Sequence, residues 1–348
     1  MRLRWMFFPI LALLLAACSE PPPREKRKLL VVGYLTEWAA YDRGYRDVDA
    51  AKLSHVKYAF GKVDRGKCAV GDAWAAYRKP DGNFGQIRRM KERNPALKVV
   101  WSFGGWNGSA GFTEAAKDPA GFASSCRRLL EDPRWAGLFD GIDIDWEYPN
   151  ACGKVCDSSG PGALTSLLAA LRAEFGPAGL ITAAIPADPG KLRAADYAGA
   201  ARHVDWLAAM TYDYFGTKGP AEAPHSALTS YPGIPRETAT AEATVTTLLE
   251  LGVPAAKLLL GVGFYGRGWT GTEHGMEDYR VLAERCPPTG TIGGTAYARC
   301  GSQWWSYDTP ATIAGKVSFA RDRGLAGVFA WELSGDSADA ALLTALSG

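Results

Sequence analysis

The 348-residue sequence lacks three features that would point to other classes of function. Its 39 Lys and Arg nearly balance its 37 Asp and Glu, so the net charge is only +2. Because the basic residues are scattered along the chain, nothing indicates a nucleic-acid-binding surface. The 4 His are well separated, and no second Cys or His pair accompanies the one close Cys pair as a zinc site would require. We therefore expect no nucleic-acid partner and no metal.

A long apolar run is also missing. The run from Met6 to Leu15 follows two arginines and is short for a membrane-spanning helix, which is typical of an export signal. The tetrapeptide Leu15-Ala-Ala-Cys18 resembles a bacterial lipobox, in which Cys18 carries a lipid; an ordinary signal peptide with a chance Cys is the alternative. We predict a lipoprotein-type signal peptide at residues 1–17 and a Pro-rich tether at residues 18–28.

This N-terminus predicts an exported chain that contacts the cell envelope through its lipid alone, or a secreted chain if the lipobox is not used. Beyond Cys18, 6 Cys remain, and an even number in an exported protein indicates disulfides. Six Cys allow about 15 pairings, and some could equally be reduced core thiols. The local pairs are Cys152 with Cys156 and Cys286 with Cys300, and the remaining pair is Cys68 with Cys126.

Eight short apolar runs indicate repeated parallel β/α units. Each run is rich in Val, Ile, Leu or aromatic residues, as buried parallel strands are. Between two pairs of runs, Pro161–Phe175 and Thr238–Leu251 carry apolar residues at helical spacing and precede Gly–Pro stops. Eight alternating units predict a single closed (β/α)8 barrel, an α/β TIM barrel over residues 29–348. The predicted strands are Leu29–Tyr34, His55–Phe60, Lys98–Phe103, Gly141–Asp145, Leu180–Ile185, Trp206–Met210, Leu258–Gly263 and Ala326–Trp331.

The fourth predicted strand ends in an unusual row of acids. Residues 140–147 read Asp-Gly-Ile-Asp-Ile-Asp-Trp-Glu. Side chains alternate along a strand, so Asp143, Asp145 and Glu147 should face the barrel interior while the apolar residues between them face the helices. Such acids repel one another, and burial raises the pKa of a carboxyl toward the value that a general acid needs at neutral pH. A site that binds a cation through carboxylates alone is the alternative.

This D-x-x-D-x-D-x-E run resembles the signature of glycoside hydrolase family 18, the chitinases. Further motifs match that family in order along nearly the whole mature chain, and they fall on the predicted strands. The stretches 148–160 and 286–308 are similar to bacterial members in particular. The matching motifs are Tyr58-Ala-Phe60, Ser102-Phe-Gly104-Gly105, Met210-Thr-Tyr212-Asp213, Gly261–Trp269 and Trp331.

The resemblance implies retaining hydrolysis without a cofactor, in which the 2-acetamido oxygen of the sugar is the nucleophile. Glu147 matches the acid that protonates the leaving oxygen and then activates water. Asp145 matches the residue that orients the acetamido group, and Asp143 matches a position beneath it that shares its proton. Tyr212 matches the donor to the acetamido carbonyl. Substrate contacts are implied at Asp213, Trp331, Met210, Tyr34, Phe60, Trp106, Tyr148 and Tyr265.

The chain departs from many family members between strands 7 and 8. Only residues 270–303 separate Trp269 from Trp304, too few for the full α+β insertion, and the Cys286–Cys300 pair would staple what remains. We expect a shallower cleft and endo-type cleavage. Ser102 and the glycines after it are expected to serve close backbone packing. Candidates for more distant sugar contacts are Trp38, Trp74, Trp106, Trp269, Trp304 and Trp305.

The sequence thus predicts a monomeric chitinase that acts on chitin or N-acetylglucosamine oligosaccharides. Two alternatives remain. An endo-β-N-acetylglucosaminidase acting on N-glycans shares the acid motif and the mechanism, and the tryptophan-rich matches favour chitin over it because a flat polymer suits stacking platforms. A lectin-like barrel would bind without cutting, and the presence of both Glu147 and Asp145 argues against it.

Overall fold

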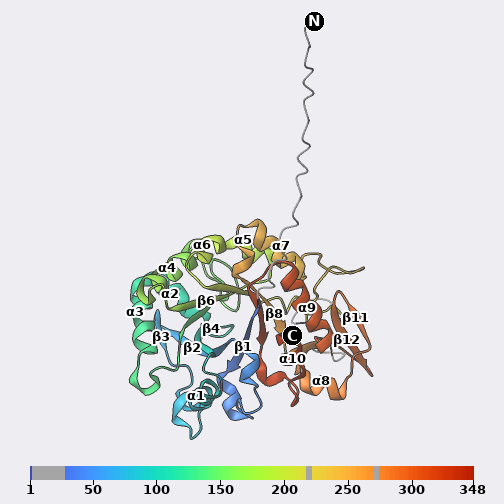
Figure 1. The fold of residues 1–348 in the computed structure, drawn as a ribbon, viewed down its shortest axis with the longest axis horizontal. Helices are drawn as coiled ribbons and strands as arrows, with labels where there is room; N and C mark the ends of the chain where they lie inside the picture. Colours follow the sequence, from blue (N-terminus) through green and yellow to red (C-terminus); the bar gives the residue numbers. More distant parts are fainter. Residues whose placement is uncertain (2–27, 217–221, 270–273) are drawn as a thin grey trace.

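The computed structural model describes residue 1 and residues 28–216, 222–269 and 274–348. The signal peptide, Cys18 and the tether up to residue 27 lie outside the described residues, so these predictions are untested. Eight parallel strands form one closed ring, in which β1 pairs with β14 on one side and with β2 on the other (Figure 1). The barrel strands are β1 (Leu30–Thr36), β2 (His55–Asp64), β4 (Lys98–Gly104), β5 (Gly141–Asp145), β6 (Leu180–Ile185), β7 (Trp206–Ala209), β8 (Leu258–Gly263) and β14 (Gly327–Trp331).

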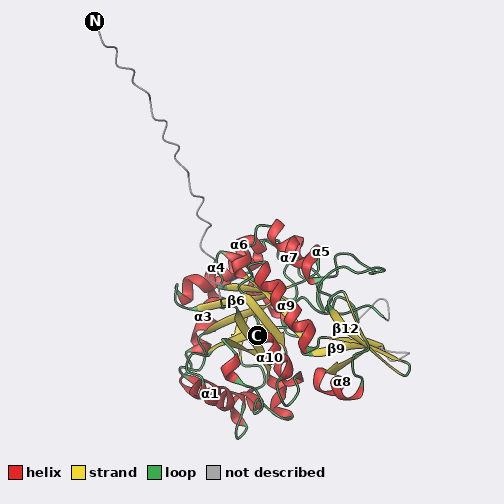
Figure 2. Cartoon of the chain, turned by 45° about the vertical axis from the view of Figure 1, so that its right-hand side comes forward, coloured by secondary structure: helices red, strands yellow, loops and turns green. Residues whose placement is uncertain are grey.

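These ranges confirm the eight predicted strands, with differences confined to their ends. β2 runs four residues beyond the predicted end, because it continues into a hairpin with β3 (Lys67–Ala69). Helices surround the ring on its outer side, as Figures 1 and 2 show. They are α1 (Asn83–Arg93), α2 (Phe112–Ala115), α3 (Pro119–Leu130), α4 (Ala163–Phe175), α5 (Pro189–Ala194), α6 (Tyr197–Ala201), α7 (Ala241–Glu250), α9 (Pro310–Asp322) and α10 (Ala341–Ser347).

Local sequence explains where several helices begin and end. The side chain of Thr309 accepts from the backbone N–H of Thr312 at the start of α9 and forms a capping box with it. Pro310 fills the first position of this helix, where a proline is favourable. The Thr240 side chain likewise caps α7. α4 ends at Gly176, whose φ of 70° is readily adopted by glycine. α4 starts two residues later than predicted, at Ala163, where no side chain caps it.

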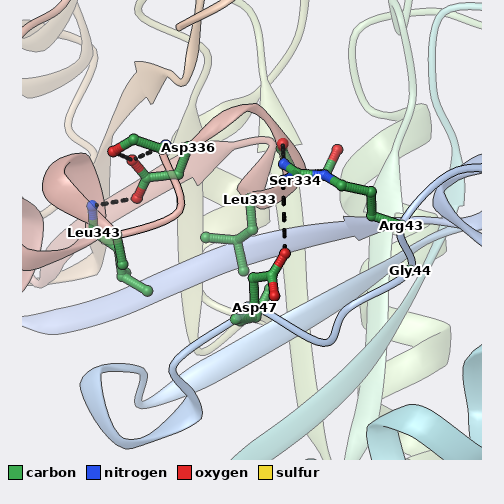
Figure 3. Close-up of a pocket in the computed structure, with 10 residues that line it drawn as sticks. Arg43, Gly44, Asp47, Leu333, Ser334, Asp336 and Leu343 are labelled. Atoms are coloured by element: carbon green, nitrogen blue, oxygen red, sulfur yellow. Dashed lines mark hydrogen bonds and ion pairs between the residues drawn. The ribbon is translucent and has the colours of Figure 1, made fainter. Parts of the chain in front are cut away.

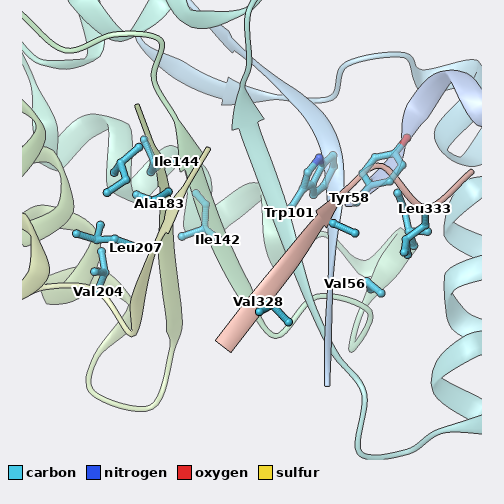
Figure 4. Close-up of a cluster of buried hydrophobic side chains, with 14 of the residues drawn as sticks. Val56, Tyr58, Trp101, Ile142, Ile144, Ala183, Val204, Leu207, Val328 and Leu333 are labelled. Atoms are coloured by element: carbon cyan, nitrogen blue, oxygen red, sulfur yellow. The ribbon is translucent and has the colours of Figure 1, made fainter. Parts of the chain in front are cut away.

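Side chains of the barrel strands alternate between two apolar layers. One layer fills the space between strands and helices and includes Ile142 and Ile144 of β5, which Figure 4 shows beside Ala183 and Leu207 of neighbouring strands. The second layer lies inside the barrel and is smaller; it includes Val32, Tyr34, Ala59, Trp206, Ala208, Leu259 and Phe329. This division confirms the alternation predicted for the acidic strand.

The segment between β8 and β14 forms a small antiparallel sheet beside the barrel (Figure 2). The reduced insertion is thus confirmed, and it is more regular than the sequence indicated. The disulfide Cys286–Cys300 joins the end of α8 to the end of β12, as predicted. The sheet has the order β10-β9-β13-β12-β11. Its elements are β9 (Tyr265–Trp269), β10 (His274–Asp278), α8 (Tyr279–Arg285), β11 (Gly290–Ile292), β12 (Thr295–Cys300) and β13 (Gln303–Tyr307).

The other two predicted disulfides are confirmed as well. Cys68–Cys126 ties β3 to α3, and Cys152–Cys156 closes a short loop after β5. Among the described helices, none is long and apolar enough to cross a bilayer.

A small pocket lies where the segment after β1 meets the segment after β14 (Figure 3). Arg43 donates to the carbonyl oxygen of Ser334 at 3.3 Å, and Asp336 accepts from the backbone N–H groups of Leu342 and Leu343 at the start of α10. The cavity is about 30 Å³. That volume holds a water molecule or two rather than a sugar ring. We therefore interpret the pocket as structural, with contacts that hold the C-terminal helix against the barrel.

Candidate active site

The acids predicted on β5 lie at the C-terminal mouth of the barrel, one above another. Asp143 is fully buried inside the barrel, Asp145 is 3 % exposed, and Glu147, just past the strand, is half-buried. The peptide bond that follows Glu147 is cis. The first acid of the motif, Asp140, is at the opposite end, where its carboxylate pairs with Lys91 at 2.7 Å. Asp143, Asp145 and Glu147 therefore lie toward the mouth of the barrel, and Asp140 lies at its base.

The Ser-x-Gly-Gly motif on β4 packs directly against this row. Ser102 donates to Asp143 Oδ2 at 2.7 Å. Gly104 has a φ of 110°, and a Cβ there would collide with the backbone carbonyl oxygen of Asp145. Gly105 has a φ of 75° and faces the ring of Phe60. The expectation of close packing is confirmed for Gly104 and Gly105, whereas Ser102 acts through its side chain, which holds Asp143.

Burial dominates the electrostatics of the two upper acids. It raises the pKa of Asp145 well above its usual range, assisted by the negative charges of Glu147 and Asp143 and opposed by the ammonium of Lys57. Burial also raises the pKa of Glu147 to about 7, while Tyr148 and Lys191 oppose that rise. A carboxyl with a pKa near neutrality can both give and take a proton at physiological pH.

Tyr212 and Asp213 follow β7 on the facing side. Burial, followed by the nearby carboxylates, raises the pKa of Tyr212, so its phenol keeps the proton that it needs to donate a hydrogen bond. Asp213 accepts from the Tyr265 hydroxyl at 2.7 Å and from two nitrogens of Arg267 at 2.8 Å. Burial acts against the charge of Asp213, but the Arg267 guanidinium outweighs it and holds the pKa of Asp213 below its usual range.

Aromatic rings make up the floor beside the acids. Trp331 lies at the end of β14, with its ring centroid 5.0 Å from that of Tyr34 and 5.8 Å from that of Phe60. The half-exposed Trp38 continues this surface, 6.2 Å from Trp331. Met210 is half-buried at the end of β7 and packs against the same inner apolar layer. Planar rings of this kind stack on the C–H faces of sugars.

Tyr34 is 1 % exposed, and its hydroxyl contacts the buried Asp143 and Lys57 rather than the open mouth. Its contact with substrate stays a prediction. On the other side of Glu147, a cavity of about 90 Å³ is lined by Trp106, which is 50 % exposed, and by the disulfide loop at Cys156. The six tryptophans predicted to make distant sugar contacts differ in exposure: Trp38, Trp74 and Trp106 are exposed, Trp269 is half-buried, and Trp304 and Trp305 are packed inside the insertion.

Three residues near the acids were not predicted from the sequence as functional candidates. Lys57 is fully buried beside Asp143; its interior position on β2 could have been read from the alternation of that strand. Lys191 on α5 lies 3.8 Å from the centre of the Tyr148 ring, beside Glu147, and nothing in the sequence indicates that proximity. Arg267 reaches Asp213 from β9, in the insertion, and only the fold brings them together.

The arrangement combines a proton donor of suitable pKa, a buried acid of raised pKa next to it, a phenol donor and an aromatic floor. No part of this set needs a redox or electrophilic group, and it suits acid–base cleavage of a glycosidic bond.

Comparisons with known proteins agree with this geometry. The family model "Glycosyl hydrolases family 18" matches residues 30–336. Chitinase C of Streptomyces lividans is 49% identical over 355 residues, which covers 88% of this chain and 57% of that protein. Chitinase 63 of Streptomyces plicatus is 47% identical over 375 residues, covering 94% of this chain and 61% of its own length.

This chain therefore spans about three fifths of those two relatives. Among solved structures, the catalytic domain of the psychrophilic chitinase B from Arthrobacter TAD20 superposes with a TM-score of 0.83 at 28% identity, and the match covers 92% of this chain and 94% of that one. The extent of the family match and the identity to both Streptomyces proteins lead to one conclusion: the chain belongs to glycosyl hydrolase family 18.

Proposed function

We propose that this protein hydrolyses the β-1,4 linkages between N-acetylglucosamine units of chitin, with retention of the anomeric configuration. The observation that carries the proposal is the pair Asp145 and Glu147 at the barrel mouth. Asp145 is 3 % exposed with a raised pKa, and Glu147 beside it has a pKa of about 7. The Streptomyces relatives named chitinases support chitin as the substrate class.

In the first step, the 2-acetamido oxygen of the sugar attacks its own anomeric carbon as the glycosidic C–O bond breaks. Glu147 gives its proton to the departing oxygen. Asp145 accepts the acetamido N–H and, as an anion, balances the positive charge of the cyclic oxazolinium, while Tyr212 donates to the acetamido carbonyl. Water then attacks the same carbon and passes a proton to Glu147, which restores both the acetamido group and the acid.

Trp331 and its aromatic neighbours are proposed to support the sugar that is cleaved, and Trp106 to support the sugar on the leaving side. We propose that the small insertion forms one side of the cleft and that its limited size permits endo-type cleavage. Export is supported by the three disulfides, which form and persist in oxidising compartments. Lipid attachment through Cys18 and a monomeric state stay predictions.

The test is to incubate the purified protein with chitin hexasaccharide and with an N-glycan, and to follow the products by mass and anomeric form. We expect shorter β-anomers of chitin fragments, and endo action predicts several product lengths at the start of digestion. Glu147→Gln should lower kcat at least about a thousandfold. Release of dimers alone at early times would remove the endo assignment, and cleavage of the N-glycan alone would change the substrate class.

Asp140→Asn is the matched control. It neutralises another acid of the same motif, one that directly precedes β5 and pairs with Lys91 and Lys98 at the base of the barrel. It should lower thermal stability and leave kcat within about threefold of the unmodified protein, because those partners are far along the strand from the mouth. Binding of the oligosaccharide without any cleavage would show that the protein is a sugar-binding barrel and not an enzyme.

A further inference from the structure

A lysine is buried inside the barrel directly under the acids. Lys57 is on β2 and has no solvent exposure. Its Nζ lies 2.8 Å from Asp143 Oδ1 and 3.2 Å from the Tyr34 hydroxyl oxygen. Burying an ammonium is costly unless an anion and further acceptors compensate it. Asp143 and Tyr34 supply that compensation, so Lys57 and Asp143 form a single buried unit without net charge.

The partners of Asp143 are all groups that donate to it. Oδ1 accepts from Lys57 and from the hydroxyl of Thr182, and Oδ2 accepts from Ser102 at 2.7 Å and from Tyr34 at 3.4 Å. Four donors fill the acceptor positions of a carboxylate. If Asp143 carried a proton, none of these neighbours would be oriented to accept it. This geometry suits a charged Asp143.

Asp145 is in the opposite situation. Its Oδ1 is buried and has no hydrogen-bond partner among the described residues. A buried carboxylate without a partner is unfavourable, so Asp145 and Glu147 together retain one proton in the free protein. The substrate-assisted reaction delivers that proton to the leaving oxygen through Glu147, and it needs Asp145 as an anion when the oxazolinium forms. The positive charge of Lys57 favours that anion, in agreement with its opposing influence on the raised pKa of Asp145.

We propose that Lys57 is a positioning residue of the hydrolysis: as the fixed counter-ion of Asp143, it keeps Asp143 charged and lets Asp145 ionise when the positive intermediate forms. This inference rests on the proposed function. Lys57 touches neither substrate nor reacting atoms and acts through the two aspartates.

Several charged or titratable groups face this unit. Tyr34 on β1 and Asp143 on β5 contact Lys57 directly, and Asp145 and Glu147 lie above it. Tyr212, after β7, is close enough to Tyr34, Asp145 and Glu147 for their negative charges to act on one another. On its own strand Lys57 has His55 at the base, where burial lowers the pKa of the imidazole to about 4, so this group is neutral over the working pH range. Lys191 on α5 and Asp213 after β7 act on Glu147 as well, with opposite effects on its pKa. Lys57 is the one cation paired with Asp143 in the described part of the chain.

The test compares pH profiles of kcat/KM on chitin oligosaccharides for Lys57→Met, Asp143→Asn and the double variant. The acidic limb reports the first proton lost by the Asp145–Glu147 pair. Lys57→Met removes a positive charge and should move that limb up by about one pH unit. Asp143→Asn leaves Lys57 without its anion and should move the limb down by a similar amount. In the double variant both charges are gone, and the limb should return to within about 0.3 of its original position.

Lys316→Met is the matched control, because Lys316 is also fully buried and paired with a single carboxylate, Asp308, and neither of the two acts on the pKa of Asp145 or Glu147. It should lower the melting temperature and leave the acidic limb in place. A purely structural role for Lys57 predicts the same behaviour for Lys57→Met. Unchanged limbs in Lys57→Met and Asp143→Asn would overturn the proposal. If Lys57→Met does not fold, Asp143→Asn and the neutral double variant carry the comparison.

A second readout does not depend on activity. The side-chain ¹³Cγ signal of Asp143, assigned with Asp143→Asn, should be that of a carboxylate at neutral pH, and as the pH falls it should begin to change toward that of a carboxylic acid at a higher pH in Lys57→Met than in the unmodified protein. If the unmodified protein cuts no chitin, the proposed function fails, and this measurement still decides whether Lys57 is the counter-ion. A protonated Asp143 in the unmodified protein contradicts the counter-ion role even if the enzyme is active.

Discussion

Arg267 and Asp213 form an ion pair with two hydrogen bonds that joins the insertion to the barrel. Arg267 Nε lies 2.8 Å from Asp213 Oδ1, and Nη2 lies 2.8 Å from Oδ2. Asp213 has a φ of 57°, a left-handed conformation that is unusual for a residue other than glycine. The surrounding contacts must therefore maintain it, and Arg267 together with Tyr265 provides them.

We expect Arg267→Met to lower kcat/KM on chitin oligosaccharides about 10- to 100-fold, because a small displacement of Asp213 and of the preceding Tyr212 disturbs the alignment of substrate. The control is Arg299→Met in the same insertion. Arg299 pairs with Glu222 on the surface, with side chains 57% and 50% exposed. Such pairs contribute little, so this variant should change kcat/KM less than about twofold. Equal effects of the two substitutions would show that Arg267 has no special role at the site.

The raised pKa of Glu147 predicts the basic limb of the activity profile. The acid must be protonated to assist the leaving oxygen, and its pKa is about 7. kcat/KM should therefore fall above pH 7, approaching about tenfold per pH unit. Circular dichroism over the same range serves as the control for unfolding. A profile that stays flat to pH 9 would identify another group as the acid, or a Glu147 pKa well above this value.

The same pKa predicts that the acid destabilises the fold at alkaline pH. Its folded-state pKa of about 7 exceeds the ordinary value of 4.5, so the folded protein binds more protons than the unfolded chain between these values. Stability contributed by this group is lost as pH rises through that window. Glu147→Gln should therefore raise the free energy of unfolding at pH 8 by at most about 3 kcal/mol, and hardly change it at pH 4. Chemical denaturation at both pH values measures this, and a loss of stability at pH 8 contradicts it.

The three disulfides should contribute to stability in the order of the loops that they close. Their sequence separations are 58 for Cys68–Cys126, 14 for Cys286–Cys300 and 4 for Cys152–Cys156. The chain-entropy model gives about 4, 3 and 2 kcal/mol for these loops. Paired Cys→Ser variants, compared by thermal unfolding, should follow this order. A larger loss from the shortest loop would show that its contacts in the folded state outweigh the entropy of the unfolded chain.

The sequence by itself determined the barrel and the central acids. Eight apolar runs at regular spacing specify parallel strands that are buried on both sides, and strand alternation places Asp143, Asp145 and Glu147 on the inner side. The stop signals and caps of α4, α7 and α9 also act within a few residues of the chain. These features could be predicted because their physical causes are local.

Only the tertiary structure decided which charges meet. Lys57 and Asp143 are 86 positions apart, and Arg267 and Asp213 are 54 apart, yet each pair is in hydrogen-bond contact. The electrostatic environment of each carboxylate depends on these partners. Asp143 and Asp213 are each paired with a cation, whereas Asp145 has no cation in contact among the described residues. Burial and distance set the energy of a charge, and both are properties of the closed barrel rather than of any segment of the chain.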